Sequence, residues 1–68
     1  MTITHVELAA DMLKVIRHAS GITLLARRAS SLSQAGDRLQ AYEAVLEMDR
    51  AIAELQRTNH AIQLKVEA

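Results

Sequence analysis

The feature that most constrains the fold is a heptad repeat of mostly apolar residues in the second half of the chain. Steps of four and three residues alternate from Ala41 to Val66, a spacing that keeps the side chains on one face of an α-helix. A helix cannot bury such a stripe alone, so we expect the chain to pack against other helices. The stripe consists of Ala41, Val45, Met48, Ile52, Leu55, Asn59, Ile62 and Val66.

The first half of the chain carries a second stripe with the same spacing. It predicts a helix from about residue 4 to about residue 34. Thr4 and Glu7 have the spacing of a capping box at the start of this helix, and Ile3 and Leu8 flank the box as a hydrophobic staple. The stripe consists of Leu8, Met12, Val15, Ala19, Ile22, Ala26 and Ala29.

Gly21 lies near the middle of this predicted helix. A glycine there costs about 1 kcal/mol relative to alanine in a helix interior. Because the apolar spacing continues on both sides, we expect at most a slight bend, and a break of the helix at this point is the alternative.

A turn is predicted between the two stripes, at residues 34 to 37. Gly36 suits the left-handed conformation that ends many helices, and Asp37 with Gln40 offers the N-cap of a second helix over residues 38 to 66. A connection this short requires the two helices to run antiparallel. The sequence therefore predicts an all-α fold, an antiparallel two-helix hairpin, as a single interaction domain over residues 1 to 68.

Folding about this turn brings small residues of the first helix opposite large residues of the second. We expect Ala19 to meet Ile52 and Ala26 to meet Val45, with both stripes buried inside the hairpin. Asn59 is the polar member of its stripe. It either fixes the register of the two helices or reaches water near their open end.

Further apolar residues lie off both stripes and are expected to bind a partner. On a body of 68 residues they would form exposed hydrophobic clusters, and such clusters usually mark a protein interface. The expected partner-binding residues are Leu13, Ile16 and Leu24 of the first helix with Tyr42, Leu46 and Ala53 of the second.

The composition limits what else the protein can do. The chain has no cysteine, tryptophan or phenylalanine and a formal net charge of zero, which excludes a disulfide framework and gives no strong field for nucleic acid. No apolar run approaches the roughly 20 residues that span a bilayer, and the first residues lack the pattern of a signal peptide. We therefore expect a cytoplasmic protein that binds neither membrane nor nucleic acid.

No residue pattern indicates catalysis, a cofactor or a metal. The three histidines lack metal-ligand spacing and are expected on solvated helix surfaces, and the serines near residue 31 lack the glycine-flanked turn of a nucleophile. The charged residues include three i, i+3 pairs that are expected to form surface ion pairs. These pairs are Asp11 with Lys14, Glu47 with Arg50 and Glu54 with Arg57.

The turn and the second helix resemble a known family. The segment Gly36-Asp37-Arg38-Leu39-Gln40-Ala41-Tyr42, followed by an amphipathic helix, is similar to the small E-type subunits of type III secretion needle chaperones, the YscE/PscE/SsaE family. The resemblance implies a bacterial cytoplasmic co-chaperone that binds a larger helical-repeat chaperone subunit and, through it, a needle subunit. Tyr42 is the one expected binding residue that this motif also carries.

Two other interpretations stay open. The first helix resembles the Rop hairpin around residues 12 to 17 and 23 to 25, and Rop-like proteins form homodimeric four-helix bundles that bind RNA. RNA recognition favours basic and stacking residues on one face, which this chain lacks. The other alternative is a self-associating structural accessory hairpin. Whether the free protein is a homodimer is open as well.

Overall fold

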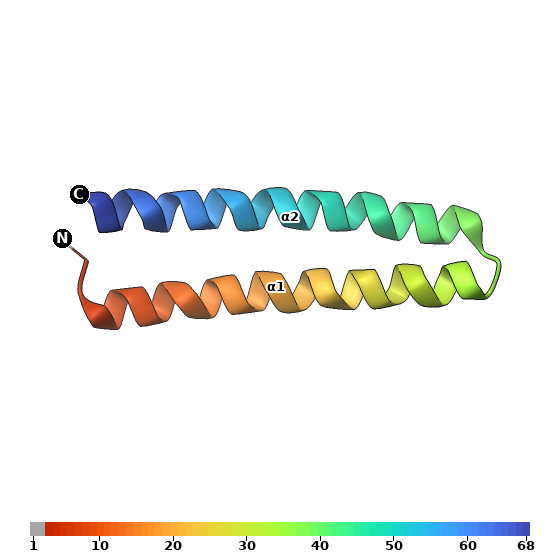
Figure 1. Ribbon diagram of the computed structural model, residues 1–68, viewed down its shortest axis with the longest axis horizontal. Helices are drawn as coiled ribbons and strands as arrows, with labels where there is room; N and C mark the ends of the chain where they lie inside the picture. Colours follow the sequence, from red (N-terminus) through yellow and green to blue (C-terminus); the bar gives the residue numbers. More distant parts are fainter. Residues whose placement is uncertain (1–2) are drawn as a thin grey trace.

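The structure, a computed structural model that describes residues 3–68, consists of two long helices joined by a tight turn. Helix α1 spans His5–Gln34 and helix α2 spans Arg38–Glu67, and each is 30 residues long. The helices lie side by side and run antiparallel, so the start of α1 and the end of α2 share the open end of the hairpin (Figure 1). The predicted all-α hairpin is confirmed, and its helix ends agree with the prediction to within one residue.

The start of α1 follows from its first few residues. The backbone of Thr4 is extended, with φ −80° and ψ 159°, and its side-chain oxygen accepts a hydrogen bond from the Glu7 backbone N–H at 3.1 Å. This bond satisfies one of the donors that a helix start leaves unpaired. Helix α1 is continuous through Gly21, so the alternative of a break at that glycine is wrong.

The turn is built from local hydrogen bonds. Gly36 has a φ of 82°, which an L side chain rarely adopts. Its N–H donates to the Ser33 carbonyl at 3.0 Å, and the Asp37 N–H donates to the Leu32 carbonyl at 2.9 Å. The Asp37 carboxylate then accepts from the Gln40 N–H at 3.1 Å, which caps α2. These are the bonds of a Schellman motif followed at once by an N-cap.

The two helices meet along what we call the contact line. Its least exposed apolar members are Ala44 and Ile62 of α2, at 3% and 6% exposure, and Ile3 is buried beside the start of α1. The remaining members recur at steps of three and four, which is the spacing of one helix face. They are Leu8, Asp11, Val15, His18, Ile22, Leu25, Ala29 and Leu32 of α1, and Ala41, Met48, Ala51, Leu55 and Thr58 of α2.

The contact line corrects one part of the predicted packing. Only alternate members of each predicted stripe face the other helix, and the rest lie on one flank of the hairpin. Met12, Val45, Ile52 and Val66 are 37 to 43% exposed, and Ala19, Ala26 and Asn59 are exposed too. Consecutive residues point about 100° apart around a helix. Asp11 and His18 therefore lie in the contact in place of their neighbours Met12 and Ala19. Asn59 reaches the surface, as one of its two alternatives predicted.

Candidate protein-binding surfaces

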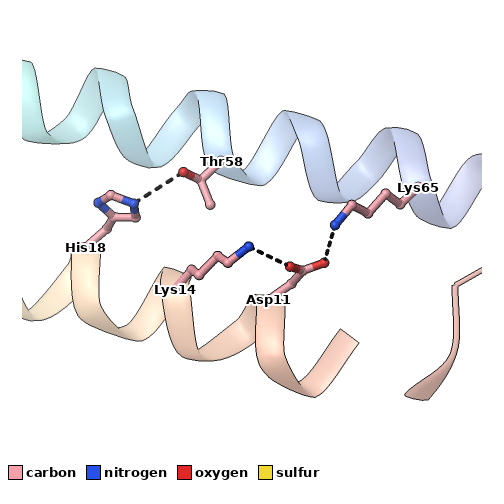
Figure 2. A network of polar contacts seen from close by, with 5 residues as sticks. All are labelled: Asp11, Lys14, His18, Thr58 and Lys65. Atoms are coloured by element: carbon pink, nitrogen blue, oxygen red, sulfur yellow. Dashed lines mark hydrogen bonds and ion pairs between the residues drawn. The ribbon is translucent and has the colours of Figure 1, made fainter. Parts of the chain in front are cut away.

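A polar network bridges the helices near the open end of the hairpin (Figure 2). Asp11, only 4% exposed, accepts hydrogen bonds from the ammonium of Lys65 at 3.0 Å and from that of Lys14 at 3.3 Å. About two turns further along, the Thr58 hydroxyl lies 3.3 Å from Nε2 of His18. The expectation that His18 is a solvated surface histidine is therefore wrong, because the ring is half-buried between the helices. At this end of the hairpin, polar side chains and charge-assisted hydrogen bonds therefore occupy positions between the helices that apolar side chains could have filled.

Two of the three expected i, i+3 pairs form. Lys14 pairs with Asp11, and Arg57 pairs with Glu54. The hydrogen bond from Arg57 holds the pKa of the Glu54 carboxyl below its ordinary value. Within residues 3–68 the third pair, Glu47 with Arg50, is not an ion pair.

The network makes a specific prediction about acid. Hydrogen bonds from Lys65 and then Lys14 hold the pKa of Asp11 below its ordinary value of 3.8, against the opposing effect of burial. A carboxyl with a depressed pKa in the folded state stabilises that state above its ordinary pKa and loses this effect as pH falls through the lowered value. We expect Asp11→Asn to lower the melting temperature at pH 7 and to flatten its decline below about pH 4.

Thermal unfolding followed by circular dichroism from pH 7 to pH 2 measures this effect. Glu47→Gln, which removes an exposed carboxylate of α2, is the matched control and should keep the acid decline of the parent protein. If the melting temperature of Asp11→Asn fell with decreasing pH as steeply as that of the parent protein, the role of the network would be contradicted.

The two broad sides of the hairpin differ in polarity. The network lies on the side that we call the charged face, where helix periodicity also places most of the other charged residues. The residues of this face include Glu7, Lys14, Arg17, Arg28, Glu43, Glu47, Arg50, Glu54 and Lys65. Both helices carry charges of both signs on this face, so it suits contact with water.

The opposite side, which we call the apolar face, lies alongside the contact line over most of both helices. Both helices share this side, as a groove at its turn end shows. The groove is lined by Ala29 and Ser33 of α1 with Arg38, Leu39, Ala41, Tyr42 and Val45 of α2, so Arg38 places one charge at this end of the face. The Thr23 hydroxyl donates to the Ala19 carbonyl at 3.0 Å and so needs no other partner. The face consists of Met12, Ile16, Ala19, Thr23 and Ala26 of α1 with Val45, Ile52, Asn59 and Val66 of α2.

A third set of apolar residues lies on what we call the outer edges. Their positions on each helix point away from the other helix, and they are 45 to 71% exposed. The residues of the outer edges are Val6, Leu13 and Leu24 of α1 with Leu39, Leu46 and Leu64 of α2. Large apolar side chains on both edges of so small a body are typical of an interaction surface.

The structure leaves five of the six expected partner-binding residues exposed, but it does not gather all six in one patch. Leu13 and Leu24 lie on the outer edge of α1, and Leu46 lies on that of α2 beside the half-buried Ala53. Ile16 and Leu24 line one groove on α1, whereas Tyr42 lines the groove at the turn. A partner that touched all six would have to reach around both edges of the hairpin.

Sequence reasoning missed the apolar face as a surface, because it assigned Met12, Val45, Ile52 and Val66 to the interior of the hairpin. The signal that could have identified this face is the width of the apolar stripe. On α1 Ile16 on one side of the stripe and Leu25 and Leu32 on the other widen it beyond what one neighbouring helix covers. A stripe of that width is typical of a helix with more than one packing partner.

Neither a metal-binding group nor a membrane-spanning helix is found among residues 3–68. Residues 3–68 hold no group of three histidine, aspartate or glutamate side chains placed to bind a metal ion. Neither α1 nor α2 combines the length and apolar content that crossing a bilayer requires. Comparison of the chain with protein-family models, with curated proteins and with solved structures gives no match.

Proposed function

We propose that the protein is a non-catalytic binding subunit that docks through its outer edges on a larger helical protein. The observation that supports this proposal is the exposure of Leu13, Leu24, Leu46 and Leu64 on the two edges that face away from the contact line. Within the hairpin, neither helix covers the outer edge of the other. A second hairpin stacked on the apolar face would also leave both edges exposed. A concave array of helices, as in helical-repeat proteins, reaches both edges at once.

The binding energy would come from burial of these side chains. Burying a leucine side chain fully is worth roughly 1.5 to 3 kcal/mol, and the outer leucines retain about half of their surface for a partner to cover. A hairpin that binds only the folded partner stabilises that partner by mass action. This is the physical action of a co-chaperone.

The resemblance of the turn and α2 to the E-type needle-chaperone subunits suggests the biological setting. In that setting the protein is a bacterial cytoplasmic co-chaperone in type III secretion. Its direct partner is a helical-repeat chaperone subunit, and the complex keeps a needle subunit from polymerising before export. The Gly36-Asp37 turn followed by Gln40 and Tyr42 is the motif that supports this assignment.

A Leu46→Asp variant tests the docking surface. We expect it to abolish partner binding and to leave the helicity nearly unchanged, because Leu46 is on the outer edge and its replacement disturbs no helix contact. Ala61→Asp, which adds the same charge at an exposed position of α2 toward the charged face, is the matched control and should bind. The measurement is co-purification of tagged protein from its source cells with mass spectrometry, followed by titration of the recovered partner.

Three outcomes of this experiment would count against the proposal. Unfolding of the Leu46→Asp variant would show that Leu46 belongs to the core. Equal binding by Leu46→Asp and the parent would exclude the outer edge of α2 as the docking surface. Co-purification of RNA with a lone homodimer would replace the co-chaperone assignment with a Rop-like regulator.

A further inference from the structure

We propose that a second copy of the chain covers the apolar face in the free protein. The two copies would form a four-helix bundle about a two-fold axis parallel to the helices, with both turns at the same end. Each α1 would then pack on α2 of the other copy. This interface is separate from the outer edges and does not depend on the proposed co-chaperone role.

The exposed area of the single chain supports a partner for this face. A compact protein of 7.5 kDa exposes roughly 4,200 Å², whereas the hairpin exposes 5197 Å². The excess, roughly 1,000 Å², is close to the area of about 800 Å² that each partner contributes to a standard protein interface. The face extends along most of a body 50 Å long, so a second copy of the same length covers it completely.

The distribution of side chains between the contact line and the apolar face supports the same conclusion. Three positions of the contact line are occupied by polar residues, Asp11, His18 and Thr58. The apolar residues Ile52 and Val45 are meanwhile 37% and 43% exposed. A lone hairpin would bury more apolar area if each helix were rotated toward the apolar face. In a four-helix bundle each helix instead points its apolar stripe between two neighbours, and both sets of residues are then buried.

The apolar face is complementary to itself under this symmetry. Because both helices have 30 residues and run antiparallel, Ala19 lies within one residue of the level of Ile52, and Ala26 within one residue of Val45. Rotation about the long axis preserves these levels and brings Ala19 of one copy against Ile52 of the other. Small residues of α1 thus receive large residues of α2, as close packing requires.

The alternative two-fold axis lies across the helices and places the turns at opposite ends. It stacks α1 on α1 and α2 on α2, so that Ala19 meets small residues and Ile52 meets Ile52 near the centre. Charge also favours the long axis. Arg27 and Asp49, toward the outer rim of the face on α1 and α2, lie about one helical turn apart in level and would approach between copies.

Sedimentation or light scattering over a range of protein concentration tests the dimer. The parent protein should be a dimer, and Ile52→Asp should raise its dissociation constant at least about 100-fold, because a carboxylate would be buried without a partner. Ala19→Arg is the second variant: Ala19 is exposed in the single hairpin, so the hairpin should fold, yet an arginine leaves no room for Ile52 of the second copy. Leu64→Asp, on the outer edge, should stay dimeric.

A distance measurement tests the symmetry. The chain has no cysteine, so Ala35→Cys carries a single spin label at the turn. We expect the two labels of a dimer to lie within about two interaxial spacings, roughly 20 Å. A separation near the 50 Å length of the hairpin would overturn the long-axis arrangement. A monomeric parent, or an Ile52→Asp variant that is folded and still dimeric, would overturn the proposal as a whole.

Discussion

An Ile62→Ala variant is expected to unfold with a free energy about 2 to 4 kcal/mol lower than that of the parent protein. Ile62 is 6% exposed and is the most buried large side chain of α2. Its truncation removes apolar contacts and leaves a cavity at the open end of the hairpin. A domain of this length has a total stability of roughly 3 to 10 kcal/mol, so the loss is a large fraction of it.

Urea unfolding followed by circular dichroism at one fixed protein concentration measures this loss, because association would otherwise shift the midpoint. Leu64→Ala is the control: it removes a similar side chain from the same helix at a position that is 54% exposed. It should change the free energy by less than about 1 kcal/mol. Equal losses for the two variants would mean that burial does not distinguish Ile62 from its neighbour.

An Ala44→Leu variant is expected to destabilise the hairpin by about 1 to 3 kcal/mol for the opposite reason. Ala44 is 3% exposed, the lowest value among the described residues, and its small side chain lets the helices approach closely. Leucine has nearly the same helix propensity as alanine, so the change tests packing and leaves helix formation almost unaffected. The larger side chain has to push α1 away or adopt a strained rotamer.

The same unfolding experiment applies, with Ala61→Leu as the control at an exposed position of α2. That control should retain the stability of the parent protein. If Ala44→Leu proved as stable as Ala61→Leu, the helices would have to be further apart at Ala44 than its burial indicates.

The fold could be predicted almost completely because its determinants are local. The Thr4 cap, the Gly36 turn and the Asp37 cap each act within a few residues, and the structure contains the bonds to the Thr4 and Asp37 side chains and the backbone bonds of the turn. Two heptad stripes separated by so short a turn permit little other than an antiparallel hairpin. The ends of α1 and α2 follow directly from these signals.

The rotation of each helix about its own axis could not be predicted from the same signals. The apolar pattern favours Met12 over Asp11 as the residue that faces α2, since a carboxylate is costly to bury alone. Asp11 nevertheless lies in the contact because Lys65, far away in the sequence, supplies its partner. Such cross-helix pairing is invisible in a pattern of hydrophobicity, and it displaces Met12 and Val45 to the apolar face.

The placement of the polar network has a consequence for the order of folding. The turn closes through bonds between near neighbours in sequence, whereas Thr58 and His18 are 40 residues apart and Lys65 and Asp11 are 54 apart. Closing a longer loop costs more conformational entropy, so we expect contacts near the turn to form first and the helices to join progressively toward the open end. We therefore expect the bond between Asp11 and Lys65 to be among the last contacts to close on folding and among the first to open when the hairpin frays.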